Sequence, residues 1–445
     1  MTAGATFLWE SLAAEMARHG ALTALASDDR ALSYADLIDR AIKRGREIGG
    51  SSGGGGRWPV EEASGPIATT IEVLAAWSVG RAPLVIRRTM AEAARAETLD
   101  LMLAAPQADA EGLLGRTSGT TGAPKLAALP GAGVNQSMAA IAGAFGWRQG
   151  DRLLAATSLS YSLGLTGGVL AALHAGVTIH AMRPGAPAPL ILQKLRSAEI
   201  TLIQGPASLH RILATLARGG AFPAVRVAGQ GGEVCTPAAA AAMASLYPNA
   251  RRVQYFGMTE AGPRVAHIDM DDPEWPLGAM GAPFPFFDWR AVPLADTPLK
   301  QLWLKGPTVL LGYLGEAGYV GLDGEGGFLS GDAIDLTPGG LPCYRGRINR
   351  CFKSGGQWVN PYTVEAALAG EAGIAGSLCR AEPHDLLGQT PVVDIILDAA
   401  TDPASIDLTE LRARLALALE PFELPTQFRF VADLARTDAG KIALA

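Results

Sequence analysis

Charged residues are scarce in this chain, and cysteines are few. Asp, Glu, Lys and Arg make up 18% of the 445 residues, against 49% hydrophobic residues, which excludes a wholly disordered chain. The 37 basic and 43 acidic side chains give a net charge of −6, without a long run of like charge. Nucleic-acid binding needs clustered cations, so we expect no nucleic-acid partner. The four cysteines form no CxxC pair and the six histidines no metal motif, which predicts reduced thiols in a cytoplasmic protein.

Charge is entirely absent from residues 153–182. A run of that length could span a membrane, since about 20 apolar residues suffice. Glycines, histidines and small hydroxyl residues interrupt the run, however, and divide it into shorter elements. We therefore predict a buried strand at 153–157, a buried helix at 165–174 and a second strand at 177–182, with no membrane span.

Apolar strand-like runs alternate with helical runs over residues 112–330, which is typical of parallel βαβ layers. The short strands and turns of residues 285–345 predict a small antiparallel or barrel-like sheet. The pattern after Gly346 predicts a small α+β domain. The fold class is therefore α/β, with a large multi-layered N-terminal domain and a small mobile C-terminal domain. The individual elements predicted are helices at 71–81, 207–217, 237–247, 359–368 and 408–419, two helices within 6–50, and strands at 83–86, 200–203, 225–228, 392–397 and 427–430.

A loop of glycines and small hydroxyl residues follows the strand-like residues 112–115. Its hydroxyls and backbone N–H groups could bind phosphate oxygens, and a lysine at its end adds a cation. The pattern differs from the P-loop, which needs GxxxxGK before Ser or Thr. A plain surface loop is the alternative. The candidate phosphate-binding residues are Thr117, Ser118, Gly119, Thr120, Thr121, Gly122 and Lys125.

Four further segments favour the phosphate-binding interpretation. They are Phe256-Gly257-Met258-Thr259-Glu260, Ser330-Gly331-Asp332, residues 346–356, and residues 436–441. In this order and spacing they resemble the adenylate-forming superfamily of acyl- and aryl-CoA synthetases, luciferases and peptide-synthetase adenylation domains. The resemblance extends over nearly the whole chain from about residue 7.

The resemblance implies an ATP-dependent, AMP-forming acid–thiol ligase. A carboxylate attacks the α-phosphate of ATP, and a thiol then attacks the acyl-adenylate. Lys441 would bridge the carboxylate and the α-phosphate, Thr259 would lie near that phosphate, and Glu260 would hold Mg²⁺, which prefers oxygen ligands. The resemblance further assigns Gly231, Gly232, Glu233, Phe256 and Gly257 to adenine binding, Asp332 to the ribose hydroxyls and Arg347 to a ribose or phosphate contact.

The same resemblance implies two domains, 1–348 and 349–445, with a trimmed N-terminal subdomain because residues 83–111 leave little room. The small domain would rotate between half-reactions and bring Lys353, Gly355 and Gly356 to a pantetheine arm. The family usually has Asp at the hinge position, where this chain has Asn349.

The substrate and the thiol acceptor are less constrained. No acidic residue lies between Arg152 and Arg183, so an α-amino acid is disfavoured and an aromatic or short to medium apolar acid is expected. Residues 353–365 look most like benzoate-type CoA ligases, which favours CoA over a carrier-protein phosphopantetheine. The alternatives are a carrier-loading adenylation enzyme and a non-catalytic nucleotide-binding protein. The pocket candidates are Tyr161, Gln204, Ala228, Gly229, Gln230 and Met258.

Overall fold

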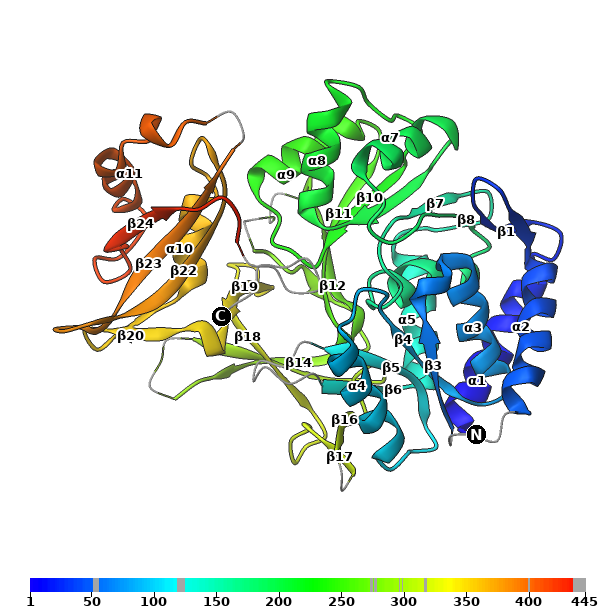
Figure 1. Cartoon of the computed structure of the whole chain (residues 1–445). Coiled ribbons are helices and arrows are strands. Elements are labelled where there is room, and N and C mark those ends of the chain that lie inside the picture. The colour runs from blue at the N-terminus through cyan, green and yellow to red at the C-terminus, as the bar shows by residue number, and fades with distance from the viewer. Residues whose placement is uncertain are drawn as a thin grey trace.

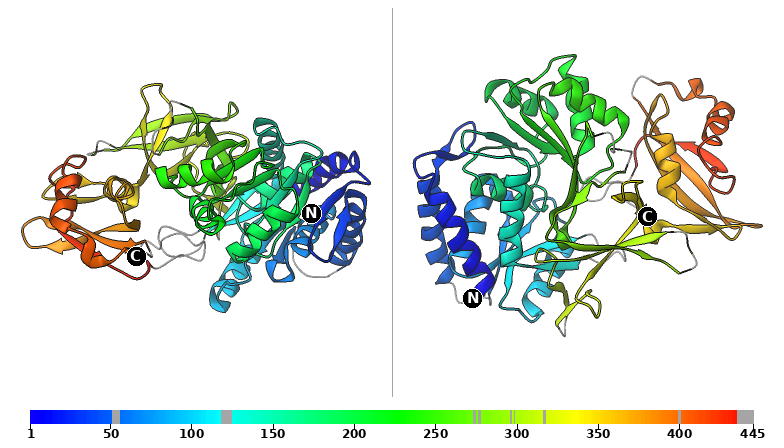
Figure 2. Two further views of the ribbon diagram at one scale, coloured as in Figure 1. Left: turned by 90° about the horizontal axis from the view of Figure 1, so that it is seen from above. Right: turned by 180° about the vertical axis from the view of Figure 1, so that it is seen from behind.

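The computed structural model describes residues 1–50, 56–117, 125–272, 275, 278–295, 297, 299–315, 318–398 and 401–434. A large N-terminal body extends as far as β19, and the elements from β20 onward form a smaller unit beside it (Figure 1). The views of Figure 2 show the same division from above and from behind. This arrangement confirms the predicted α/β class with a large and a small domain.

A nine-stranded sheet forms one layer of the large body, in the order β13-β12-β11-β10-β9-β7-β8-β1-β2. The strands from β1 to β11 in this order pair in parallel, and β2, β12 and β13 add antiparallel edges. Every residue of β9 and β10 is buried, as expected of parallel strands covered on both faces. The strands are β1 (Thr23–Ala26), β2 (Ala31–Ser33), β7 (Arg152–Ala155), β8 (Thr178–Ala181), β9 (Leu202–Gly205), β10 (Val227–Gly231), β11 (Arg251–Met258), β12 (Gly262–Asp269) and β13 (Ala282–Pro283).

A six-stranded sheet forms a second layer, in the order β17-β16-β6-β5-β4-β3. Antiparallel pairing of β5 with β6 places Thr117 opposite Lys125, so both ends of the candidate phosphate loop lie together. The strands are β3 (Arg57–Glu61), β4 (Ala82–Ile86), β5 (Glu111–Thr117), β6 (Lys125–Pro130), β16 (Gly312–Gly315) and β17 (Gly318–Val320).

Two smaller sheets follow along the chain. An antiparallel four-stranded sheet, β14-β15-β18-β19, confirms the small sheet expected near residues 285–345. The C-terminal unit contains the β20–β21 hairpin and a three-stranded sheet, β22-β23-β24. The strands are β14 (Asp288–Pro293), β15 (Lys300–Lys305), β18 (Phe328–Leu336), β19 (Pro342–Arg347), β20 (Phe352–Ser354), β21 (Gln357–Val359), β22 (Ile374–His384), β23 (Gly388–Leu397) and β24 (Gln427–Phe430).

Helices cover both faces of the nine-stranded sheet, because their apolar sides pack into two separate clusters. One cluster includes side chains of α1, α2, α3, α5 and α6, and the other includes side chains of α7, α8 and α9. The helices are α1 (Ala3–Ala17), α2 (Tyr34–Gly49), α3 (Pro66–Ser78), α4 (Glu92–Ala104), α5 (Gly131–Ala144), α6 (Ala171–His174), α7 (Ala188–Ser197), α8 (Ala207–Ala217), α9 (Pro237–Leu246), α10 (Pro361–Leu368) and α11 (Leu408–Leu415).

The uncharged residues 153–182 form β7, a π-helix (Leu165–Leu170) continuous with α6, and β8. The predicted division of this segment is therefore confirmed. Across the described ranges, the helices are too short or too polar to cross a bilayer. The four cysteines are free, as expected.

Candidate active site

Lys125, Tyr313 and Glu260 form a connected group at the end of the six-stranded sheet. The Tyr313 hydroxyl donates a hydrogen bond to Oε1 of Glu260 at 2.7 Å. The Lys125 ammonium lies 5.1 Å from the centre of the Tyr313 ring, within cation–π range. Burial, followed by the Glu260 charge, raises the pKa of Tyr313, so this hydroxyl remains a donor at neutral pH. The pairing of β16 with β6 therefore brings together Tyr313 and Lys125, which are 188 positions apart in the sequence.

Tyr313 is a candidate site residue that the sequence did not reveal. A tyrosine in a short strand is usually a core residue, and its position beside Lys125 depends on the pairing of Tyr313 with Ala127. Thr259 begins the short helical turn after β11 and touches β5, because a Cβ built on Gly115 would lie 2.3 Å from Thr259 Cγ2. Ser118, Gly119, Thr120, Thr121 and Gly122 lie outside the described residues.

Asp332 and Arg347 form an ion pair across β18 and β19, where the strand register places them opposite each other. Arg347 Nε lies 2.9 Å from Asp332 Oδ1, and the Asp332 side chain is 2% exposed. Arg347 also donates to the Ser330 carbonyl at 2.9 Å. Burial alone would lower the pKa of Arg347, but interactions with Asp332 first, and then with Tyr344, Glu260 and Tyr313, together raise it. The Glu260 carboxylate thereby links the ion pair electrostatically to the Glu260 group.

The candidate adenine residues lie at the carboxyl ends of two adjacent parallel strands. Gly231 ends β10 and pairs with Tyr255 of β11, next to Phe256. The Phe256 ring lies 6.3 Å from the Tyr344 ring, centre to centre. Ligands of open α/β sheets bind at such carboxyl edges.

The remaining residues assigned to adenine binding have local structural constraints. Gly257 passes close to β12, since a Cβ there would lie 2.0 Å from the Pro263 carbonyl oxygen. Gly232 has a φ of 84°, which favours glycine. Glu233 accepts hydrogen bonds from the Ser208 backbone at 2.9 Å and from the Ser208 hydroxyl at 3.0 Å. Its carboxylate is therefore held at the first turn of α8.

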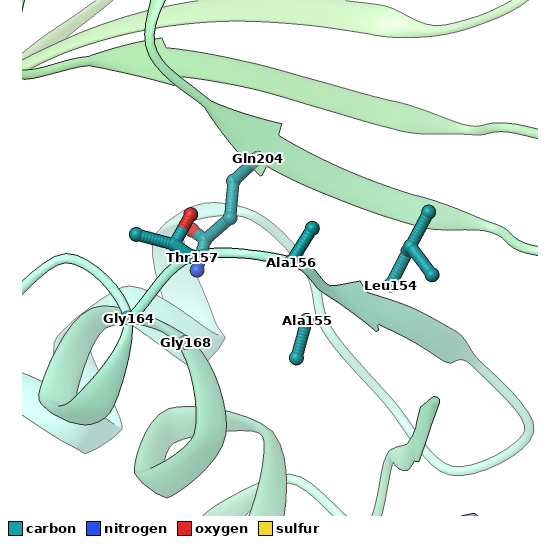
Figure 3. Close-up of a pocket in the computed structure, with 7 residues that line it drawn as sticks. All are labelled: Leu154, Ala155, Ala156, Thr157, Gly164, Gly168 and Gln204. Carbon is teal, nitrogen blue, oxygen red and sulfur yellow. The ribbon is translucent and has the colours of Figure 1, made fainter. Parts of the chain in front are cut away.

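Two small cavities beside the uncharged segment are lined by candidates for the acyl pocket, Gln204 in the first and Tyr161 in the second. Figure 3 shows the first, in which Gln204 extends from β9 toward Thr157 and the helical turn that carries Gly164 and Gly168. The second cavity is lined by Tyr161 and Thr259 among other residues, so a pocket candidate and a candidate catalytic residue share one space.

The four remaining pocket candidates lie outside the lining of the two cavities. Ala228 packs with side chains of α8 and α9, and Met258 packs in the larger core cluster. A Cβ on Gly229 would lie 1.8 Å from the Tyr255 hydroxyl. Gln230 is fully buried, and neither polar atom of its side chain has a hydrogen-bond partner. These four residues do not line the two cavities.

Glu62 is a carboxylate beside the uncharged segment that the local sequence did not reveal. It is 1% exposed and accepts hydrogen bonds from the Ser158 hydroxyl at 2.7 Å and the Leu159 backbone at 2.6 Å. The absence of acidic residues within 153–182 therefore did not exclude a carboxylate there. Its oxygens are already engaged by the protein, so it is poorly placed to bind a substrate ammonium group.

The candidate pantetheine-side residues form the β20–β21 hairpin. Gly355 and Gly356 are its two turn residues, with φ of 56° and 82°, as a type I′ turn requires. The Lys353 ammonium lies 5.2 Å from the centre of the Trp358 ring. Lys441 lies outside the described residues.

Asn349, the candidate hinge, is exposed within a short helical turn (Ile348–Arg350). Arg347, just before this turn, binds Asp332 of the large body. Arg350, at its end, binds Glu365 of α10 through two hydrogen bonds of 2.6 and 3.0 Å. The two arginines therefore anchor opposite sides of Asn349.

The sequence model of the AMP-binding enzyme family matches residues 69–314, more than half of the chain. The chain belongs to this family. The match includes Lys125, Glu260 and Tyr313, and it ends before the Asp332–Arg347 pair. The family resemblance inferred from the motifs is therefore confirmed.

Individual relatives of this AMP-binding enzyme are similar to it at moderate identity. A feruloyl-CoA synthase from Amycolatopsis sp is 28% identical over 343 residues, covering 74% of this chain and 68% of that protein. The phenyloxazoline synthase MbtB from Mycobacterium sp. (strain MCS) is 28% identical over 348 residues, covering 73% of this chain and 29% of that protein. The solved o-succinylbenzoate CoA synthetase from Bacillus subtilis, in complex with its acyl-adenylate intermediate, has a TM-score of 0.83 at 18% identity. That superposition covers 97% of this chain and 96% of the other, and it shows the shared fold.

Proposed function

We propose that this AMP-binding enzyme is an acid–CoA ligase that activates an aromatic or short to medium apolar carboxylic acid. The observation that carries the proposal is the grouping of Lys125, Tyr313 and Glu260 beside the Asp332–Arg347 ion pair. One group offers a cation and a carboxylate suited to phosphates and a hard metal ion, and the other offers a buried carboxylate suited to hydroxyl donors.

The residues fit ATP and Mg²⁺ by their chemistry. The described part of the chain contains no cluster of three or more His, Cys, Asp or Glu side chains that could hold a metal alone. Mg²⁺ usually takes one or two carboxylates together with substrate phosphates, so Glu260 would suffice as the protein ligand. ATP would supply the adenylyl group and the leaving pyrophosphate.

Within this proposal, each chain residue acts by position and charge. Lys125 and Thr117, with the loop between them, would bind the outer phosphates, and Asp332 would orient the ribose. Lys441 would neutralise charge as the acid attacks the α-phosphate. We also propose that the domain boundary lies at 348/349, which would let the β20–β21 hairpin replace the Lys441 side for thiol attack.

The test is acid-dependent pyrophosphate release over a broad panel of carboxylic acids. We expect release with at least one acid, loss of release in Lys441→Ala with ATP binding retained, and no change in Lys43→Ala, an exposed control on α2. An unchanged rate in Lys441→Ala would refute the role of that lysine. AMP binding without release for any acid would instead support a non-catalytic nucleotide-binding protein.

The second candidate function is loading of a carrier-protein phosphopantetheine; the chain matches 29% of the phenyloxazoline synthase MbtB, so the similar segment is one part of a longer protein. Supplying either CoA or a phosphopantetheinylated carrier after adenylation separates the two. Thioester formation with the carrier but not with CoA would replace the first proposal by the second.

A further inference from the structure

Arg264 on β12 is a buried cation without a carboxylate partner in the described part of the chain. It is 3% exposed, and its guanidinium lies 3.5 Å from the centre of the Tyr255 ring. Nη1 donates to the Pro263 carbonyl at 2.8 Å, and Nη2 donates to Gln204 Oε1 at 2.7 Å. Nε is buried and has no hydrogen-bond partner.

Such a cation is costly unless another charge compensates it. Arginine stays protonated in proteins, and burial of an unpaired charge costs several kcal/mol. Arg57 shows the usual solution in this chain, because it is 5% exposed and binds Glu111 through two nitrogens. Within the described residues, the contacts of Arg264 are with neutral groups and not with a carboxylate, so its environment is suited to an anion from outside the chain.

Arg264 itself lines neither of the two cavities, but residues beside it line both. Its hydrogen-bond partner Gln204 lines the first cavity. A Cβ on Gly167 would lie 3.1 Å from Arg264 Nη1, so the π-helix passes directly beside the guanidinium. The preceding residue, Thr166, lines the second cavity, is 2% exposed, and has a hydroxyl without a hydrogen-bond partner.

We propose that the acid substrate carries a second carboxylate at the far end of its apolar body, and that this carboxylate binds Arg264 with Gln204 and Thr166 alongside. The proposal rests on the proposed acid activation and names its substrate class. The first carboxylate would react near Thr259, which shares the second cavity with Thr166. The second carboxylate would supply the missing counter-charge and accept hydrogen bonds from the guanidinium.

The test compares acids that differ only in the second carboxylate: butanoate with succinate, hexanoate with adipate, and benzoate with terephthalate. Acid-dependent pyrophosphate release gives kcat/KM for each acid in the wild type, Arg264→Met and Arg264→Lys. Arg290→Met is the matched control, because Arg290 also lies on an aromatic ring, 4.2 Å from the centre of Trp303, but is exposed and paired with Asp288 and Glu325.

We expect the wild type to favour at least one diacid over its monoacid by about 10- to 100-fold, the size of a charged hydrogen bond. Arg264→Met should abolish that preference, Arg264→Lys should retain part of it, and Arg290→Met should leave it unchanged. A wild-type preference for the monoacid in every pair would overturn the inference while leaving acid activation intact. This outcome is measured on the wild type alone, so it does not depend on the folding of a variant. A diacid preference that persists in Arg264→Met would also overturn it.

Direct binding separates this inference from the proposed function. If no acid supports pyrophosphate release, the change in melting temperature with each acid is measured for the wild type and both Arg264 variants. A rise with a diacid that is lost in Arg264→Met would support the anion site without ligase activity. Equal shifts with diacid and monoacid in every pair would overturn the site as well.

Discussion

Replacement of Asp332 by Asn tests the ribose-binding role most directly. The side chain keeps its size but loses its charge, and the wild-type carboxylate is 2% exposed. Two hydroxyl hydrogen bonds to a carboxylate are worth about 1.5–3 kcal/mol each, and charge assistance supplies roughly half of that. ATP affinity should therefore fall by about 1.5–3 kcal/mol, roughly 10- to 150-fold. The folded protein should lose only about 1 kcal/mol, because the Arg347 side chain is 38% exposed.

The assay is calorimetric titration of ATP into the wild type and Asp332→Asn, with urea unfolding of both proteins. Asp335→Asn is the matched control, because Asp335 lies on the same strand and is exposed. It should bind ATP like the wild type. Wild-type ATP affinity in a folded Asp332→Asn protein would refute the ribose role and leave Asp332 as a structural partner of Arg347.

Three further predictions concern stability and packing. Glu111→Gln should lower the free energy of unfolding by about 3–5 kcal/mol in urea, because it leaves buried Arg57 without a counter-charge. The control Glu61→Gln breaks a pair whose side chains are 39% and 41% exposed and should cost under about 1 kcal/mol. Equal losses in the two variants would contradict the distinction between buried and exposed pairs. Gly115→Ala should slow pyrophosphate release about tenfold or more, because the added Cβ would lie 2.3 Å from Thr259 and displace it. The control Gly143→Ala on α5 meets no atom within 4 Å and should leave the rate unchanged. Equal rates in the two variants would exclude a positioning role for Thr259. Burial lowers the pKa of His210 from 6.5 to about 4, so below pH 6.5 the unfolded chain binds a proton that the native protein does not. Stability should therefore fall by up to about 3 kcal/mol between pH 6.5 and pH 4, and urea unfolding of His210→Gln should show a correspondingly shallower slope; parallel slopes would contradict this assignment.

The sequence predicted elements well where one periodic pattern spans the whole element. Helix α8 and strand β24 coincide with the predicted residues 207–217 and 427–430. The helix expected at 359–368 instead begins at Pro361, because the Asn360 side chain caps it by accepting from the Tyr362 backbone. The strands β1 and β2 were not expected between the first two helices. They are too short to carry a pattern, and β1 is stabilised by pairing of Leu25 with Ile179.

The candidate residues that the sequence did not reveal share one property, which is that their contacts come from neighbours distant in the sequence. Tyr313 donates to Glu260 from a strand 53 residues away, and Glu62 binds Ser158 from 96 residues away. Arg264 belongs to the predicted βαβ region, but only the packed structure shows that no carboxylate of the described residues binds it. Motif residues could be assigned from order and spacing, whereas these contacts require the packed sheets.

The proposed hinge at Asn349 combines information from the motifs and from the packed structure. Arg347 and Arg350 are three residues apart, yet one binds Asp332 in the large body and the other binds Glu365 in the small domain. In the proposed rotation at Asn349 both ion pairs can stay intact, because each lies on one side of this exposed residue. An aspartate at this position, which the family resemblance implies, would add a charge beside two arginines that Asp332 and Glu365 already neutralise. A neutral side chain is therefore compatible with the proposed hinge.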